Sequence, residues 1–205
     1  MTSSREVLTI GHSNHSMADF LSLLKQHQIT ALADVRSAPY SRYAPHFSKA
    51  PLVQALGRYE IKYVFLGNEL GGRSDDPSCY DHGRVQYAHL TQTTSFGYGI
   101  GRVVKGATSE RIVLMCAEKD PLNCHRTLLV APPLIERGVD VQHIRSDGSL
   151  ESHHGAMLRL LDMNGLPQAD LFHNTEDLID EAMTRQEARI AYTDKSLDQE
   201  SWIAP

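Results

Sequence analysis

Two cysteines, a histidine and an arginine lie close together in residues 116–126, and these types could do chemistry together. Cys116 ends an apolar, strand-like run, and a seven-residue loop separates it from Cys124, where we expect a helix to begin. His125 and Arg126 would then lie in the first helical turn. The partial positive charge of a helix N-terminus binds anions, and nearby cationic side chains lower the pKa of a thiol. This stretch predicts an anion pocket or an activated thiol at Cys124.

The spacing of these residues argues against some familiar cysteine sites. A cysteine phosphatase needs an arginine at the position after Cys116 that Leu122 occupies. A thioredoxin-like site needs a Cys-x-x-Cys motif, whereas seven residues separate Cys116 from Cys124. Structural zinc sites favour ligand pairs about two to four residues apart, so we expect no metal site. Because free cysteines are often buried, a core position is an alternative for Cys116.

A second polar group follows residues 7–10, which form a short strand-like run. His12 comes directly after this run and is a candidate general base or phosphate ligand. Ser13 and Asn14 are candidates for contacts to a substrate. The alternative is a simple capping loop, because serine and asparagine commonly satisfy helix N-termini.

A third group lies at the end of residues 29–35. The planar guanidinium of Arg36 suits a carboxylate or phosphate, so we expect it to bind an anion, with Asp34 orienting it. A structural ion pair between the two is the alternative. Tyr43 adds an aromatic surface near basic side chains, which could stack on a base.

The remaining candidates come from the segment GNELGGR and from the residues after the first cysteine. The carboxylates of Glu69 and Glu118 are candidates for moving protons, and Arg73 is a candidate for binding an anion. Adjacent glycines let a backbone approach a ligand closely, although they also mark ordinary turns. These residues are Glu69, Gly71, Gly72, Arg73 and Glu118.

The elements that must position these groups are an alternation of strands and helices. Five apolar runs predict strands at residues 7–10, 29–35, 61–66, 111–116 and 139–144. This alternation implies an α/β fold with a single open, mainly parallel sheet and helices on both faces, a Rossmann-like architecture. Ligands bind beyond the carboxyl ends of the strands in such sheets, so the polar groups should converge on one edge.

The helices are predicted from caps and apolar spacing. Ser16, with Asp19 three positions on, and Ser48 are expected N-caps. A third helix is expected over about residues 100–105, after a long irregular stretch. A proline pair must end or kink the fourth helix, over residues 125–136.

The charge distribution suggests a division of the chain. Residues 1–150 carry a net charge of +2, and residues 151–205 carry −7. We predict an α/β domain over residues 1–154 and an acidic, partly helical C-terminal extension over residues 155–205. Thr175 is the expected N-cap of a helix reaching Tyr192, and the last dozen residues are expected to form a loose tail.

Composition excludes several classes of protein. With 41% hydrophobic and 22% charged residues, the chain is neither a collagen, a coiled-coil rod nor a disordered chain. No apolar run is long enough to cross a membrane, and no secretory signal is expected. Three cysteines make no disulfide framework, which predicts the reducing cytoplasm. A net charge of −5 shows no strongly basic face, although local basic clusters stay open.

Several motifs together resemble a known bacterial family. The segments TIGHSNHS, LADVRSAPYSRYAPHF, YVFLGNELGGR and RIVLMCAEKDPLNCHR, followed by a DG turn, occur in order between residues 9 and 148. In this region the chain resembles the family called "domain of unknown function 488". The resemblance implies a shared site but supplies no reaction, and residues 155–205 lie outside it. The family pattern carries over onto His12, Ser13, Asp34, Arg36, Tyr43, Gly67, Glu69, Leu70, Gly71, Gly72, Arg73, Cys116, Glu118, Cys124, His125 and Arg126.

These observations favour an enzyme that acts on a small anionic substrate. Nucleotides, nucleosides, phosphate esters and nucleobases are the substrate classes considered, and a hydrolase or transferase is the favoured type. Three arginines would neutralise the anion, three other side chains would move protons, and Cys124 would be the nucleophile or a polarising group. The sequence requires no cofactor. The arginines are Arg36, Arg73 and Arg126, and the proton-transfer candidates are His12, Glu69 and Glu118.

Two alternatives come from other classes of protein. One is a module that binds nucleic acid or protein without chemistry, which predicts salt-sensitive binding. The other is a metal or redox sensor that uses Cys116, Cys124 and His125. No membrane partner is expected.

Overall fold

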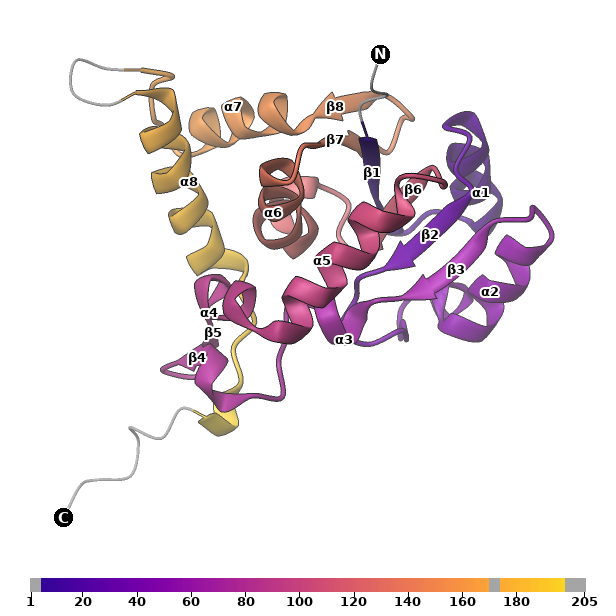
Figure 1. Ribbon diagram of the computed structural model, residues 1–205, viewed down its shortest axis with the longest axis horizontal. Helices are drawn as coiled ribbons and strands as arrows, with labels where there is room; N and C mark the ends of the chain where they lie inside the picture. The colour runs from indigo at the N-terminus through magenta and orange to yellow at the C-terminus, as the bar shows by residue number, and fades with distance from the viewer. Residues whose placement is uncertain (1–4, 170–173, 198–205) are drawn as a thin grey trace.

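A six-stranded, mainly parallel sheet forms the centre of the molecule (Figure 1). The computed structural model describes residues 5–169 and 174–197. The strand order is β3-β2-β6-β1-β7-β8, with the first five strands parallel and β8 antiparallel to β7. The predicted α/β class is confirmed. The strands are β1 (Arg5–Gly11), β2 (Ala31–Asp34), β3 (Lys62–Phe65), β6 (Ile112–Cys116), β7 (Val139–Ile144) and β8 (Leu150–Ser152).

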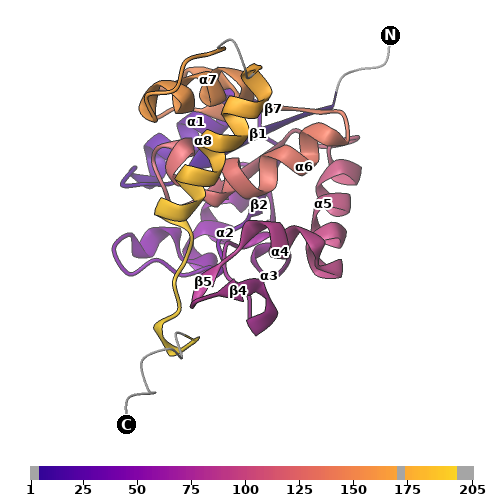
Figure 2. The ribbon, with the colours of Figure 1, turned by 90° about the vertical axis from the view of Figure 1, so that its left-hand side faces the viewer.

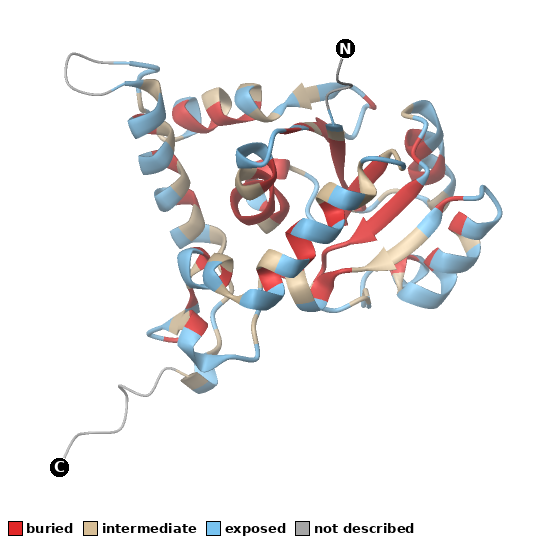
Figure 3. Cartoon of the chain, in the orientation of Figure 1, coloured by how far each residue is buried: buried red, intermediate tan, exposed pale blue. Residues whose placement is uncertain are grey.

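Each face of the sheet is covered by helices and has its own apolar cluster. On β6, Val113 and Met115 pack with α1 (Met17–Gln26) and α2 (Lys49–Gly57). Leu114 and Cys116 face the other cluster, which includes α5 (Thr94–Gly106) and α6 (Ala131–Glu136). The alternation follows from the two-residue period of a strand. Figure 3 shows the resulting buried centre of the sheet.

The first two helices begin at the predicted residues. The Ser16 hydroxyl oxygen accepts from the backbone N–H of Asp19 at 3.1 Å, as a side-chain cap does. Ser48 also occupies the N-cap position of α2, but its side chain makes no capping bond. Its hydroxyl oxygen instead accepts from the backbone N–H of Ser41. Ser48, the expected cap, therefore stabilises the loop before α2 and does not cap the helix with its side chain.

The stretch expected to be irregular contains short elements. They are α3 (Gly67–Leu70), a 3-10 turn (Pro77–Cys79), the two-stranded ribbon of β4 (Tyr80–Asp81) and β5 (Arg84–Val85), and α4 (Tyr87–Gln92). The helix α5 begins at Thr94, earlier than expected, because the Thr93 hydroxyl accepts from the backbone N–H of Phe96 and caps it.

The helix expected over residues 125–136 is present, but its first part has a different form. Cys124 has extended backbone angles, and His125 is the N-cap of a short π-helix (Arg126–Val130) that leads into α6. The Cys124 carbonyl accepts from the backbone N–H groups of Thr127 and Leu128, so the helical hydrogen bonds begin at Cys124, and His125 and Arg126 lie in the first turn, as predicted. The prolines lie in the first turn of α6, where they lack N–H donors. The wider π-turn brings the backbone N–H of Ala131 to the carbonyl of Arg126 instead.

The C-terminal part contains α7 (His153–Met163) and α8 (Thr175–Ile190). Asn174, not Thr175, is the N-cap of α8, because it exchanges hydrogen bonds with Asp177 in a capping box. The helix ends at Ile190, so it is shorter than predicted. Leu178 of α8 is buried in the same apolar cluster as the sheet.

Two predictions about this part of the chain stay open. The division of the chain at residue 154 stays a prediction. The expected loose tail falls partly on residues 198–205, which lie outside the described residues. Within the described ranges, no helix combines the length and apolar character needed to span a bilayer.

Candidate functional site

A cavity of about 500 Å³ lies beyond the carboxyl ends of β2 and β6. Eight of the residues singled out in the sequence line it: Arg36, Tyr43, Gly72, Arg73, Cys116, Glu118, Cys124 and His125. Its size is within the range of about 300–1,000 Å³ that holds small ligands. The strand order places these groups together, since β2 and β6 are direct neighbours in the sheet.

Two sulfur atoms and an imidazole nitrogen meet in the wall of the cavity. The Nδ1 atom of His125 lies 3.7 Å from Sγ of Cys116 and 3.9 Å from Sγ of Cys124. On the other side of the ring, Nε2 lies 2.9 Å from the carbonyl oxygen of Val35. A carbonyl only accepts hydrogen bonds, so Nε2 carries a proton and Nδ1 is directed at the sulfurs. Both cysteines are buried and free.

The two thiols have opposite acidities. The hydrogen bond to Cys124 and burial raise the pKa of Cys116 well above its ordinary value. Burial alone would raise the pKa of Cys124. The hydrogen bond with Cys116 and the charges of Arg126 and His125 nevertheless bring it well below its ordinary value. The negative charge of the pair therefore belongs on Cys124, and the proton on Cys116.

The fully buried Arg126 lies behind the cavity wall and does not line it. Its Nη1 donates to the carbonyl of Glu118 at 2.8 Å, and its Nη2 to the carbonyl of Lys119 at 3.4 Å. A side chain at Gly11 would collide with that Glu118 carbonyl, at 1.8 Å from a Cβ, so a glycine is needed there. In the described ranges Arg126 has no carboxylate partner, and its Nε has no partner at all. Its charge acts on the thiols instead.

Arg36 is held in a fixed position at the end of β2. Its Nε and Nη2 donate to the two carboxylate oxygens of Asp34 at 2.8 and 2.6 Å. Asp34 also accepts from the hydroxyl of Tyr63 at 2.8 Å. Within the described part of the chain, Nη1 of Arg36 is buried without a hydrogen-bond partner. Arg36 and Asp34 thus form the ion pair considered as the structural alternative. Nη1 of Arg36, which lines the cavity, is still available to donate to a ligand.

The rim of the cavity is basic and aromatic. Tyr43 is 95% exposed and Tyr40 is 68% exposed, so neither packs into the core. The guanidinium of Arg73 lies 4.1 Å from the ring centroid of Tyr192, close enough for a cation–π interaction. Arg42 also lines the rim. This combination suits a ligand with a charged group and a planar group.

Glu118 and Gly72 complete the predicted residues in the wall. Loss of hydration, and to a lesser extent the Cys124 thiolate, raise the pKa of Glu118. A carboxyl group with a raised pKa is suited to moving a proton near neutral pH. A Cβ at Gly72 would lie 3.1 Å from Cγ of His125, so this position packs against the imidazole ring.

Several predicted residues lie outside the cavity lining. His12 is buried and stacks on Phe47 at 4.5 Å, and burial lowers its pKa to about 4. The Glu69 carboxylate pairs with Arg102 at 2.8 Å. The hydroxyl of Ser13 donates to Asn14. The residues that do not line the cavity are His12, Ser13, Asn14, Asp34, Glu69, Gly71 and Arg126. Of these, Asp34 and Arg126 support residues that do.

Sequence reasoning missed part of the lining. Tyr87 lies in the stretch expected to be irregular, and Ile190 and Tyr192 lie in the C-terminal extension. The segment after α8 runs beside β5, where the backbone N–H of Val85 donates to the carbonyl of Tyr192 at 2.9 Å (Figure 2). No local pattern marks such long-range contacts. Ser37, Ala38, Tyr40, Ser41, Arg42, Ala117 and Asn123 could have been found, since they lie in the quoted motifs. The residues missed are Ser37, Ala38, Tyr40, Ser41, Arg42, Tyr87, Ala117, Asn123, Ile190 and Tyr192.

The fold and the site define a mainly parallel α/β protein with a thiol-containing cavity at the carboxyl edge of its sheet. The chain belongs to the family described as "Domain of unknown function DUF488", which matches residues 16–131. The resemblance noted from the sequence is thereby confirmed. Comparison with the curated proteins and with the solved structures finds no match. The family match includes the cavity cysteines but ends before Ile190 and Tyr192.

Proposed function

We propose that the protein is an enzyme, a hydrolase or transferase, acting on a small anionic substrate that carries a planar group. Nucleotides and nucleobase-containing phosphate esters have this chemistry. The observation that carries the proposal is that Cys124 and Glu118 share one cavity with Arg36, Arg42 and Arg73. Reactive groups and anion-binding groups thus face the same space.

Binding of the anion is assigned to the three arginines. Arg36 offers Nη1, which has no hydrogen-bond partner within the described residues. Arg42 and Arg73 are exposed at the rim, and neither forms an ion pair in the described part of the chain. Unpaired guanidinium groups around a concave site favour a carboxylate or phosphate. Tyr40, Tyr43 and the ring of Tyr192 supply flat surfaces for the planar part of the ligand.

The chemical step is assigned to Cys124 and Glu118. In the attacking role, the sulfur forms a bond to the electrophilic carbon or phosphorus as the bond to the leaving group breaks. Glu118 gives a proton to the leaving group and then takes one from the water that releases the product. In the polarising role, Cys124 acts through its charge alone. Arg126 stabilises the negative charge in both roles.

Two further features of the proposal concern partners and location. The rim arginines also favour contact with the phosphates of nucleic acid, which is the non-catalytic alternative. The three free cysteines favour a reducing compartment, so we place the protein in the cytoplasm.

The proposal is tested by calorimetric titration with inorganic phosphate and with a nucleoside monophosphate. Arg42→Gln and Arg73→Gln should each weaken binding by about tenfold or more, since a charge-assisted hydrogen bond contributes about 1.5 kcal/mol or more. Arg137→Gln, an exposed arginine on α6's C-terminal side, is the matched control and should change nothing. Equal affinity in all four proteins, or no binding by the wild type, would contradict the proposed site.

A further inference from the structure

We propose that Cys116, Cys124 and His125 bind a divalent, thiophilic metal ion such as zinc, with a fourth coordination position open to the cavity. This inference rests on the cavity of the proposed function and selects the polarising role of Cys124 over the attacking one. The binding of the ion itself does not depend on the identity of the substrate.

The distances between the three donor atoms fit a tetrahedral site. All three atoms lie within 4.8 Å of one another, and Nδ1 lies 3.7 and 3.9 Å from the two sulfurs. Zinc bonds of about 2.3 Å to sulfur and 2.0–2.1 Å to nitrogen, at tetrahedral angles, place nitrogen and sulfur about 3.5 Å apart. A contraction of a few tenths of an ångström would bring the ligands to these distances.

The orientation of the histidine is the second observation. Nε2 of His125 donates to the Val35 carbonyl at 2.9 Å, so the imidazole directs Nδ1 at both sulfurs. Metal-binding histidines typically donate their other ring N–H to a carbonyl or carboxylate, which fixes the tautomer and the ring plane. Packing of Gly72 against the ring restrains the same orientation. The histidine is therefore arranged before any ion binds.

The ligand set is incomplete on the cavity side. Cys116, Cys124 and His125 all line the cavity, and Glu118 is not within the group of close donors. Three protein ligands with an open position are typical of catalytic zinc sites, whereas structural sites are closed by four. The open position would take water or the anionic substrate. Because the ion occupies the Cys124 sulfur, that sulfur does not attack the substrate in the metal-bound protein.

The loop between the cysteines explains why their spacing gave no signal. Cys116 is fixed by β6, and the following residues fold back through a 3-10 turn (Pro121–Asn123). Asp120 holds that turn, since its carboxylate accepts from the backbone N–H of Leu122 and pairs with Arg159. The side chain of Gln186 donates to the Leu122 carbonyl. Contacts with distant residues thus bring the two thiols together in space. Their spacing in the sequence is longer than that of the ligand pairs typical of structural zinc sites.

The test is titration of the full-length, chelator-treated and reduced protein with cobalt(II), followed by competition with zinc. The wild type should bind one ion per chain, and the absorption spectrum should show sulfur-to-cobalt charge transfer and tetrahedral bands. Cys116→Ser, Cys124→Ser and His125→Gln should each weaken binding by at least tenfold. Cys79→Ser and His89→Gln are matched controls, because neither residue belongs to the donor group, and both should bind as the wild type does.

A measurement on the wild type covers the case in which a variant fails to fold. Zinc should protect Cys116 and Cys124 from alkylation, as mapped by mass spectrometry. The absence of a charge-transfer band, or equal alkylation of these cysteines with and without zinc, would overturn the inference. Arg42→Gln and Arg73→Gln separate it from the proposed function. If phosphate affinity is the same in the wild type and both arginine variants while cobalt still binds, the function alone is overturned. If both variants weaken phosphate binding but the wild type binds no cobalt, the metal site alone is overturned.

Discussion

Two buried arginines flank the candidate site and have their charges balanced in different ways. Arg36 is paired with Asp34 through two short hydrogen bonds, so its charge is compensated inside the protein. Arg126 is fully buried, and among the residues that the structure describes it donates only to the carbonyls of Glu118 and Lys119. A buried charge without an opposite charge is costly, so it favours negative charge nearby.

Because of this difference, the two arginines have different roles: Arg36 fixes the shape of the cavity, and Arg126 affects the acidity of a thiol. The Arg36–Asp34 pair makes a rigid corner at the end of β2, and Nη1 of Arg36 has no hydrogen-bond partner within residues 5–169 and 174–197. Arg126 instead acts on Cys124, and its charge helps to lower the pKa of that thiol. One arginine therefore shapes the cavity, and the other determines the charge of its sulfur.

The largest effect is expected from removing the charge that compensates Arg36. Asp34→Asn leaves a guanidinium buried without its carboxylate, and it should lower the free energy of unfolding by about 3 kcal/mol. Urea denaturation followed by circular dichroism measures this change. Glu69→Gln is the control, since its partner Arg102 is partly exposed, and it should cost less than about 1 kcal/mol. Similar losses in the two variants would show that Arg36 is not compensated in the way described.

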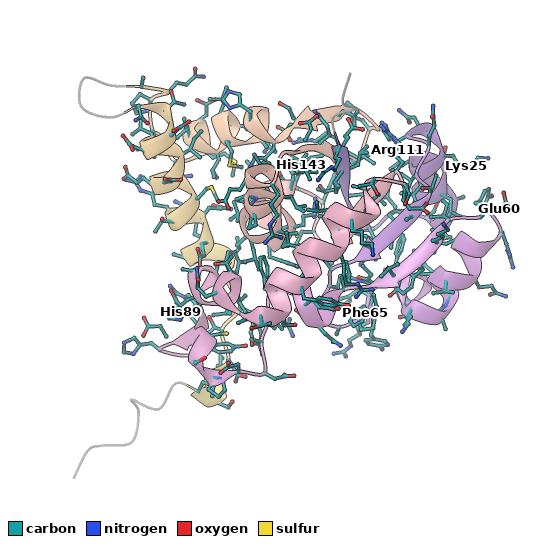
Figure 4. The ribbon with its side chains drawn as sticks, in the orientation of Figure 1. Lys25, Glu60, Phe65, His89, Arg111 and His143 are labelled. Atoms are coloured by element: carbon teal, nitrogen blue, oxygen red, sulfur yellow. The ribbon has the colours of Figure 1, made fainter. Side chains whose placement is uncertain are left out.

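A smaller effect is expected from histidines near Arg126. His143, labelled in Figure 4, shares hydrogen bonds with Thr9 at 2.8 Å and with His153 at 3.3 Å. Burial, then the charges of His153 and Arg126, lowers its pKa to about 2. Burial and His154 lower the pKa of His153 to about 4.

Both histidines make stability depend on pH in one direction. With folded-state pKa values below the unfolded value of about 6.5, the unfolded chain binds more protons as the solution is acidified. Their contribution is present above pH 6.5 and is lost as the pH falls toward 4. As the pH falls from 6.5 to 5.5, each histidine should lower the free energy of unfolding by about 1 kcal/mol. Urea titrations at these two pH values measure it, and His143→Gln should reduce the pH dependence. An unchanged pH dependence in that variant would contradict the assignment.

The sheet could be predicted from sequence because its signals are local. The apolar run before Cys116 and the cap formed by Ser16 each depend on residues within a few positions. The start of the helix next to Cys124 was predicted for the same reason, but its π-helical form was not. The π-helix directly before the prolines of α6 depends on hydrogen bonds that a helical pattern does not reveal.

The cavity could be predicted only in part. Residues at strand ends, such as Arg36 and Cys116, were found because parallel strands share a carboxyl edge. His12 also follows a strand, but it turns inward and stacks on Phe47, which only tertiary packing decides. Tyr192 reaches the cavity from the far end of the chain, through pairing with β5 that no nearby residue indicates.

The smallest expected effect tests the role of Arg126 directly. Arg126→Met keeps an unbranched side chain in the buried position but removes the positive charge that acts on Cys124. Without that charge, the pKa of Cys124 should rise toward its ordinary value. The measurement is a pH titration of thiolate ultraviolet absorbance in the metal-free protein. Arg137→Met, exposed at the end of α6, is the control and should leave the titration curve unchanged. If the curve of Arg126→Met also stays unchanged, the buried guanidinium does not stabilise the thiolate, and the contrast between the two arginines is only one of packing.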